Sequence, residues 1–314
     1  MSNYANVSVV IPYYNNSIYV EKALQSIFEQ TLLPKEIIVI DDCSSDSHSL
    51  NVILKNYINK DDKIKVILHR NSVNKNGAYC RNLGINKARQ KYIALLDADD
   101  YWMNNHIEVM INSIEENDFI FSNIVYVEGV SLRNKKVTDP SELKNKFDIL
   151  FFSPPQTNSF FFKKESLRAV SFDESLLRHQ DYQFFIDILS LNLKYKYIDS
   201  YTTCYRIFGK KKTSKEGYYS VFNFWTKYRN KFDHKLFNKN IMKLLFDATL
   251  THDDDFIFNI LKMYRIFDQI NHSYNIFLKI ILFFKPISER KEKIIRVIYA
   301  LMYEKMKIFK RFFV

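Results

Sequence analysis

Four short apolar runs alternate with helical patterns in the first hundred residues, and this alternation constrains the fold most strongly. The runs are residues 7–11 (VSVVI), 36–40 (EIIVI), 64–68 (IKVIL) and 92–96 (YIALL). Continuous runs of this length, rich in β-branched residues, are typical of strands that are buried on both faces. Strands that alternate with helices form a mainly parallel sheet covered by those helices. The sequence therefore predicts an α/β fold.

The pattern changes after residue 96. Apolar segments at 119–127 and 159–162, a helical pattern at 182–191 and a strand pattern at 195–198 predict an α+β continuation. From about residue 214 the chain shows successive helical patterns, which include 242–250, 256–267 and 294–313. We predict a first domain at residues 1–210 and a helical C-terminal region at 211–314.

Composition excludes several classes of protein. The chain has 314 residues, of which 47% are hydrophobic, so it is long and apolar enough to bury a large core. Its cysteines, Cys43, Cys80 and Cys204, are far apart and form no Cys-x-x-Cys pair, which argues against a disulfide framework or a thiolate zinc site. No secretory signal or membrane-spanning run is recognised in the sequence, so we expect a cytoplasmic protein.

The positive charge is concentrated at the C-terminal end. The net charge is +11, and from Lys279 onward ten Lys or Arg residues stand against three Glu. Phe, Ile, Leu and Tyr recur among these basic residues at helical spacing, as in helices that lie in a lipid headgroup layer. This predicts peripheral attachment to the inner face of the cytoplasmic membrane. The alternative is a solvated helix packed on the main domain.

Two acidic loops follow predicted strands. Asp41 and Asp42 come after the second strand, and Asp97, Asp99 and Asp100 come after the fourth. The carboxyl ends of parallel strands meet at one sheet edge, where ligands of such folds bind. Clustered carboxylates repel one another unless a cation is present, and Mg²⁺ and Mn²⁺ prefer oxygen ligands. The loops therefore suggest a metal-bound diphosphate, although helix caps and turns are also rich in Asp.

Four segments of the sequence resemble the signature blocks of the family-2 glycosyltransferases, in the family's order. They are VSVVIPYYNN, ALQSIFEQTLLPKEIIVIDDCSSD, GAYCRNLGINKARQKYIALLDADD and FDESLLRHQDYQFFIDIL, and the similarity runs from Val7 to about Arg206. This resemblance implies a GT-A fold and a metal-dependent, inverting transfer from a nucleotide-sugar. A UDP-sugar is the donor expected from the family. The expected acceptor is a glycan, lipid-linked, in O-antigen, capsule or lipooligosaccharide biosynthesis.

The resemblance also assigns roles to residues. It implies that Asp99 binds Mn²⁺ or Mg²⁺, and that Asp181 is the base that deprotonates the acceptor hydroxyl. It implies a backbone approach to the donor at Gly77. The residues expected to contact the donor are Pro12 and Tyr14 beside the nucleotide, Asp41 and Asp42 at the base, Arg81 at the nucleotide, Asp97 at ribose or metal, Asp100 near the sugar, and Arg206 at the diphosphate.

The sequence departs from the family pattern at two positions. Gln180 stands where the family has the Glu of a Glu-Asp pair, and Phe208 stands where many relatives carry a histidine. The first departure leaves Asp181 as the only carboxylate of the pair, although Asp181 could simply cap a helix. Trp102 is expected either at the floor of the sugar pocket or in the core. His179 is expected to be structural or to face the acceptor.

Three other functions are open to a chain of this composition. A nucleotidyltransferase also uses carboxylate-held Mg²⁺, but the opening segment lacks a glycine-rich phosphate loop. A nucleic-acid-binding protein would fit the basic charge, but the acidic loops oppose it and no binding motif is present, so we expect no nucleic-acid partner. A catalytically dead glycan-binding module would be excluded by donor hydrolysis.

Overall fold

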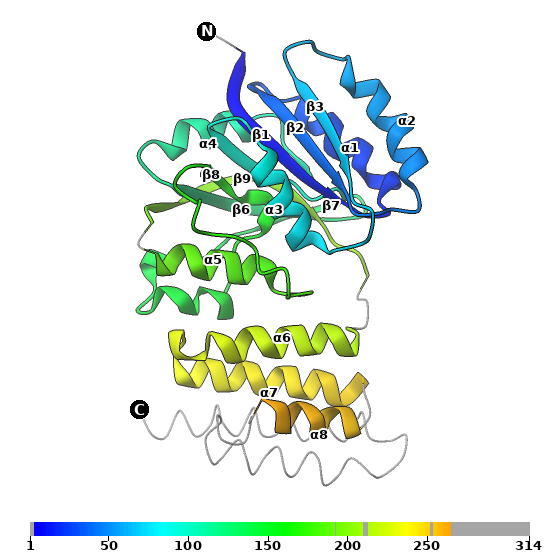
Figure 1. Ribbon diagram of the computed structural model, residues 1–314. Coiled ribbons are helices and arrows are strands. Elements are labelled where there is room, and N and C mark those ends of the chain that lie inside the picture. Colours follow the sequence, from blue (N-terminus) through cyan, green and yellow to red (C-terminus); the bar gives the residue numbers. More distant parts are fainter. Residues whose placement is uncertain (1–2, 192, 210–212, 252–253, 265–314) are drawn as a thin grey trace. The chain divides into compact units, whose positions relative to one another are not determined.

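Figure 1 shows the computed structural model, which describes residues 3–191, 193–209, 213–251 and 254–264. The chain divides into two compact units, Met1–Phe224 and Trp225–Val314. The strands of the first unit form one sheet in the order β3-β2-β1-β4-β8-β6-β9-β5, with β7 beside β6. The sheet begins with four parallel strands and continues as a mixed sheet.

The parallel part agrees with the four runs seen in the sequence. Its strands are β1 (Tyr4–Tyr13), β2 (Leu33–Asp41), β3 (Lys65–Arg70) and β4 (Tyr92–Leu95). The connecting helices are α1 (Ser17–Phe28), α2 (Ser47–Ile58) and α3 (Gly77–Lys87). The prediction of an α/β fold with a parallel sheet is confirmed, and each strand ends within a few residues of the predicted boundary.

Helices cover both faces of this sheet, which explains why β1, β2 and β4 are largely buried, while the edge strand β3 is only partly buried. Val9 and Ile37 pack in one core cluster with Leu24 of α1 and Leu50 of α2. Val10, which points to the opposite face, lies under α3. Figure 1 shows α1 and α2 together on one side of the strands and α3 on the other.

Gly84 allows α3 to approach β1 closely. A Cβ atom added at Gly84 would lie 2.3 Å from Cγ1 of Val10, far inside van der Waals contact. We expect Gly84→Ala to destabilise the protein by about 1–3 kcal/mol, because overpacking outweighs the higher helix propensity of alanine. Chemical denaturation would measure this change. Gly209→Ala is the matched control, since nothing lies within 4 Å of a Cβ at that position, and equal stabilities of the two variants would contradict the packing argument.

The second half of the sheet carries elements that the sequence did not reveal. The segments β5 (Tyr101–Trp102), α4 (His106–Ile114) and β7 (Ser131–Lys135) were not predicted. The predicted ones are β6 (Phe119–Glu128), β8 (Phe161–Lys163), α5 (Gln180–Ser190) and β9 (Tyr195–Arg206). Short 3₁₀ turns at Pro140–Glu142, Lys146–Phe151 and Thr157–Ser159 connect β7 to β8. Strand β9 is much longer than expected and runs parallel to β6 as far as Arg206.

The described part of the C-terminal unit is helical. It contains the end of α6 (Lys215–Lys227), the 3₁₀ turn Arg229–Lys231, α7 (His234–Thr251) and α8 (Asp254–Met263). Of the helices described, none has the length and apolar character needed to cross a bilayer. The predicted helix at 294–313 and the basic tail lie outside the described residues. The domain division at residue 210 and the membrane attachment therefore stay predictions.

Candidate active site

A cleft of about 220 Å³ lies where α3, β4, α5 and β9 meet. It brings together three residues that the sequence singled out, Arg81, Asp97 and Asp181, although they lie far apart in the chain. The other lining residues are Gln156, Thr157, Leu177, Arg178, His179, Gln180 and Tyr205. Charged and hydrogen-bonding side chains therefore dominate the cleft.

Arg81 joins two walls of the cleft. Its Nη2 lies 2.5 Å from Oδ1 of Asp97 and its Nη1 donates to Oε1 of Gln180 at 3.1 Å. A Cβ on Gly77 would come within 3.0 Å of Nη1, so the glycine leaves room for the guanidinium. Gln180, at the position of the family's glutamate, thus binds Arg81 through a neutral amide. Gly77 thus accommodates Arg81, and its expected backbone approach to the donor stays a prediction beside the alternative of a plain turn at the start of α3.

Asp181 lies in the first turn of α5. Burial raises the pKa of its carboxyl to about 6, although the backbone N–H of Tyr182 and the charge of Arg81 oppose the shift. A carboxylate with this pKa is ionised at neutral pH and is a stronger base than an exposed aspartate. The neighbouring His179 stacks on Tyr182, and burial lowers its pKa to about 4, so its imidazole is neutral.

The acidic loop after β4 contains one enclosed carboxylate and two that remain partly accessible. Asp100 is 2% exposed, and its carboxylate accepts hydrogen bonds from the backbone N–H of Arg206 at 2.6 Å and from Nδ2 of Asn158. Asp97 and Asp99 stay partly exposed. Burial and the charge of Asp97 raise the pKa of Asp99. Three carboxylates thus lie close together here, an arrangement that suits a bound cation even though Arg81 and Arg206 offset part of the charge.

A resident metal would have to take part of its coordination from a ligand. Among the residues that the structure describes, no three His, Cys, Asp or Glu side chains are grouped to hold a metal ion. Asp97 and Asp99 supply accessible oxygen donors of the kind that Mg²⁺ and Mn²⁺ prefer. The donor set therefore fits a hard divalent ion that shares its coordination sphere with phosphate oxygens.

Arg206 places a positive charge next to this loop. Its Nη1 donates to the backbone carbonyl of Asp99 at 2.9 Å. Its guanidinium lies over the rings of Tyr19 and Tyr101, at 5.2 and 5.1 Å from their centroids. Phe208, at the position of the expected histidine, packs on Tyr19. Arg206 is thus fixed within reach of a ligand at Asp99.

Trp102 belongs to the core. Its side chain is 3% exposed, donates from Nε1 to the carbonyl of Asn158 at 2.9 Å, and stacks on His106. Of the two expected locations for Trp102, the structure supports packing.

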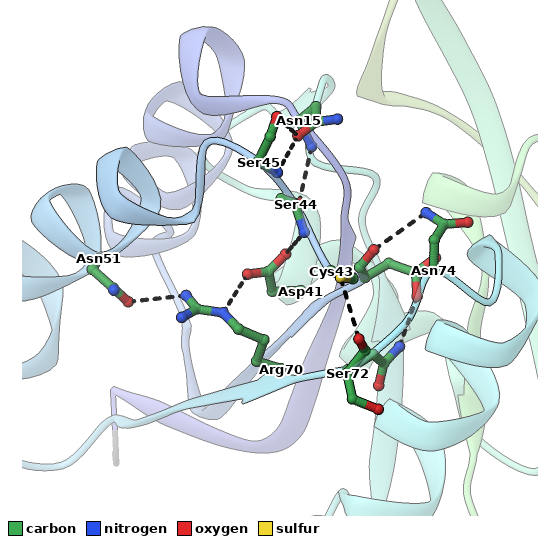
Figure 2. Close-up of polar contacts among 11 residues, drawn as sticks. Asn15, Asp41, Cys43, Ser44, Ser45, Asn51, Arg70, Ser72 and Asn74 are labelled. Carbon is green, nitrogen blue, oxygen red and sulfur yellow. Dashed lines mark hydrogen bonds and ion pairs between the residues drawn. The ribbon is translucent and has the colours of Figure 1, made fainter.

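The loops after β1 and β2 form a second polar cluster, which Figure 2 shows. Oδ2 of Asp41 accepts from Nε of Arg70 at 2.7 Å, and its Oδ1 accepts from the backbone N–H of Ser44 at 3.0 Å. The hydroxyl of Ser44 accepts from the backbone N–H of Asn15 at 3.1 Å. Asp41 therefore ties the loops after β1 and β2 to the end of β3.

Asp42 fixes the segment that leads into α3. Its carboxylate accepts from Nδ2 of Asn71 at 2.7 Å and from the backbone N–H groups of Asn76 at 2.8 Å and Lys75 at 2.9 Å. Both acidic side chains of this loop are thus engaged within the protein, and their contact with a base stays a prediction. Pro12 lies near the end of β1, opposite Ile40 of β2, and Tyr14, 52% exposed, directly follows β1.

Sequence reasoning missed Arg70, Gln156, Thr157 and Tyr205. Arg70 ends β3, so the rule that led to the acidic loops would also have found it. Gln156 and Thr157 follow two prolines in a segment without periodicity, and no pattern marked them. Tyr205 directly precedes Arg206, but it was missed because the predicted strand ended at residue 198, whereas β9 extends to Arg206.

The parallel sheet carries acidic loops at the carboxyl ends of β2 and β4, and the cleft contains Asp181, whose pKa is raised. This combination is that of a glycosyltransferase of the GT-A class. The model of glycosyl transferase family 2 matches residues 8–180, more than half of the chain, and the protein belongs to this family. The predicted GT-A-like fold and the predicted glycosyltransferase activity are thereby confirmed.

Relatives and solved structures agree with this assignment. An uncharacterized glycosyltransferase of Methanocaldococcus jannaschii is 31% identical over 72% of this chain and 80% of its own. The amylovoran biosynthesis glycosyltransferase AmsB of Erwinia amylovora is 29% identical over 68% of this chain and 75% of its own. The Escherichia coli UDP-Glc:alpha-D-GlcNAc-diphosphoundecaprenol beta-1,3-glucosyltransferase WfaP is 28% identical, with coverages of 64% and 77%. S. aureus TarS 1-349 in complex with UDP-GlcNAc has a TM-score of 0.62 at 15% identity and covers 95% of this chain and 91% of that one.

Proposed function

We propose that the protein is an inverting, metal-dependent glycosyltransferase that moves a sugar from a UDP-sugar to a lipid-linked glycan in surface-polysaccharide biosynthesis. The observation that carries the proposal is the cleft, in which the basic carboxylate of Asp181 faces Arg81 and Asp97. A single general base beside an acidic loop suits a single displacement at the anomeric carbon.

Asp181 accepts the proton of the acceptor hydroxyl as that oxygen attacks the anomeric carbon. The attack comes from the face opposite the nucleoside diphosphate, the carbon–oxygen bond to the diphosphate breaks, and the configuration inverts. A general base contributes most when its pKa lies near the working pH, and a pKa of about 6 is close to that condition. An α-linked donor then yields a β-linked product.

Asp99, with Asp97, would hold the divalent ion. Such an ion neutralises charge that develops on the leaving diphosphate. Arg206 beside Asp99 and Arg81 beside Asp97 offer guanidinium groups to the same oxygens. The predicted roles of Pro12, Tyr14, Asp41, Asp42 and Asp100 around the nucleotide and sugar complete the donor site.

The donor and acceptor classes follow from relatives and from charge. TarS has been solved with UDP-GlcNAc, WfaP is named for a UDP-sugar and a diphosphoundecaprenol acceptor, and AmsB is named for amylovoran biosynthesis. A lipid-linked acceptor also fits the basic, aromatic C-terminal end of the sequence, which would hold the enzyme at the inner face of the cytoplasmic membrane.

A panel of nucleotide-sugars tests the proposal. Thermal shift and donor hydrolysis would be measured with UDP-, GDP- and dTDP-sugars, with and without Mn²⁺, on the wild type and on Asp99→Ala. One Mn²⁺-dependent response that is lost in the variant supports the proposal and names the donor. If no nucleotide-sugar binds the folded wild type, the proposed function is wrong.

The pKa of Asp181 predicts the pH dependence of transfer. The base acts only when ionised, so kcat at saturating donor and metal should be level above pH 7 and fall by about tenfold per pH unit well below pH 6. If the pKa of the base were that of an unperturbed aspartate, the enzyme would keep its kcat down to about pH 4. A rate that stays constant to pH 4.5 would contradict the raised pKa.

A further inference from the structure

A row of side chains on one face of the sheet leads from an exposed hairpin into the cleft. Strand β6 pairs with β7 on one side and with β9 on the other, so that Tyr126 lies opposite both Arg133 and Tyr205. Residues directly opposite one another on neighbouring strands share a face. The guanidinium of Arg133 lies 5.3 Å from the centroid of the Tyr126 ring, and that ring is 5.9 Å from the ring of Tyr205. Tyr205 in turn lines the cleft with Asp181.

The outer end of this row is cationic. Arg133 is exposed, and within the described part of the chain it makes no ion pair. Lys135 lies opposite Ile124 and, two residues from Arg133, faces the same side of the sheet. Tyr126 and Tyr205 are partly exposed. The row thus offers two aromatic rings near the base and two positive charges farther out.

Strand geometry places this row and Arg206 on opposite faces of β9. Tyr205 and Arg206 are consecutive in β9, so their side chains point to opposite faces. Arg206 is held at the carbonyl of Asp99, between Tyr19 and Tyr101. Arg206 therefore lies on the opposite face of β9 from Tyr205, whereas Arg81 and Asp97 line the cleft together with Tyr205 at the inner end of the row.

We propose that Tyr205, Tyr126 and Arg133 form an acceptor subsite for a saccharide that carries an anionic group next to the sugar that receives the transfer. The proposal rests on the proposed function and adds the class of acceptor. Tyrosine rings pack against the C–H face of a sugar. A guanidinium that stacks on an aromatic ring binds a phosphate or a carboxylate through two parallel hydrogen bonds. Asp181 then reaches the hydroxyl of the sugar above Tyr205.

Three synthetic acceptors with the same alkyl chain test the subsite. They are an alkyl α-N-acetylglucosaminide, the same sugar joined to the chain through a diphosphate, and the same sugar linked to an alkyl α-glucuronide. We expect at least one charged acceptor to be used roughly tenfold better in kcat/KM than the neutral one, the difference of one charge-assisted contact. Which charged acceptor is preferred distinguishes a lipid diphosphate from a sugar carboxylate. Equal use of the three, or transfer to none while donor hydrolysis is intact, overturns the subsite.

Variants assign the effect to residues. Arg133→Gln should remove the preference for the charged acceptor and leave the neutral acceptor unchanged, while Arg133→Lys should restore part of it. Tyr126→Ala should lower kcat/KM for all acceptors by roughly tenfold, and Tyr126→Phe should not. Arg168→Gln, at an exposed arginine paired with Glu165, is the control and should change nothing.

Donor turnover separates failure of the subsite from failure of the proposed function. Donor KM and donor hydrolysis should be the same in the wild type and in every variant of this row. A wild type that hydrolyses no donor overturns the proposed function. Intact donor hydrolysis with an acceptor preference that Arg133→Gln leaves unchanged overturns the subsite alone.

Discussion

Asp181→Asn is expected to lower kcat for sugar transfer by roughly 10³-fold, because the amide keeps the shape of the side chain but cannot accept the proton. Donor affinity should change little, since the diphosphate is expected at Asp97, Asp99 and Arg206. The measurement is single-turnover transfer at saturating donor and metal. Turnover near the wild-type rate in a folded Asp181→Asn protein would show that another group is the base.

The same variant should be at least as stable as the wild type. The pKa of Asp181 is higher in the folded chain than in the unfolded one, so its charge destabilises the fold increasingly as pH rises from about 4 to 6. Removing that charge should raise the free energy of unfolding at neutral pH by up to about 3 kcal/mol, which corresponds to a rise in the pKa from about 4 to about 6. Asp187→Asn is a control on the same helix, where the carboxylate accepts from Gln183 at 2.7 Å and lines no part of the cleft. That variant should retain full activity.

Asp99→Asn is expected to reduce transfer by a similar factor, roughly 10³-fold, through loss of charge stabilisation at the leaving diphosphate. It should also abolish the increase in melting temperature that donor and Mn²⁺ produce together. A ligand raises the melting temperature only if it binds the folded protein, and the variant should no longer bind the ion. Single-turnover transfer measures the first effect, and calorimetry with and without Mn²⁺ measures the second. The exposed Asp62, replaced by Asn, should leave the Mn²⁺ response intact. An Asp99→Asn protein with an unchanged Mn²⁺ response would remove Asp99 from the metal site.

The parallel half of the fold was predictable because the edge strand β3 carries an apolar run although it is only partly buried, and because β1, β2 and β4 are buried on both faces. Such strands appear in the sequence as uninterrupted apolar runs, and Val9 and Ile38 show no exposed surface. The position of the acidic loops at one edge then follows from the topology alone. The segments β5, β7 and α4 were missed because β5 contains two residues, β7 is exposed along most of its length, and α4 is a short helix.

The site was predictable only in part, because its assembly depends on contacts between distant residues. Arg81, Asp97 and Asp181 were named from the family pattern, and the structure places them in one cleft. The enclosure of Asp100 was not foreseen, since its partners Asn158 and Arg206 are distant in sequence. Nothing in the local sequence distinguishes a buried carboxylate such as that of Asp100 from a partly exposed one such as that of Asp99.

The hydrogen bond between Asp100 and the backbone of Arg206 has a consequence for folding, since it joins positions 106 residues apart. A contact of such long range stabilises the fold only once the chain entropy lost on closing the loop has been offset. We therefore expect the acidic loop to acquire its final shape when β9 adds to the sheet. A fragment that ends at residue 180 would contain the whole segment matched by the family and both accessible carboxylates of the loop. It would still lack the strand that holds them in place.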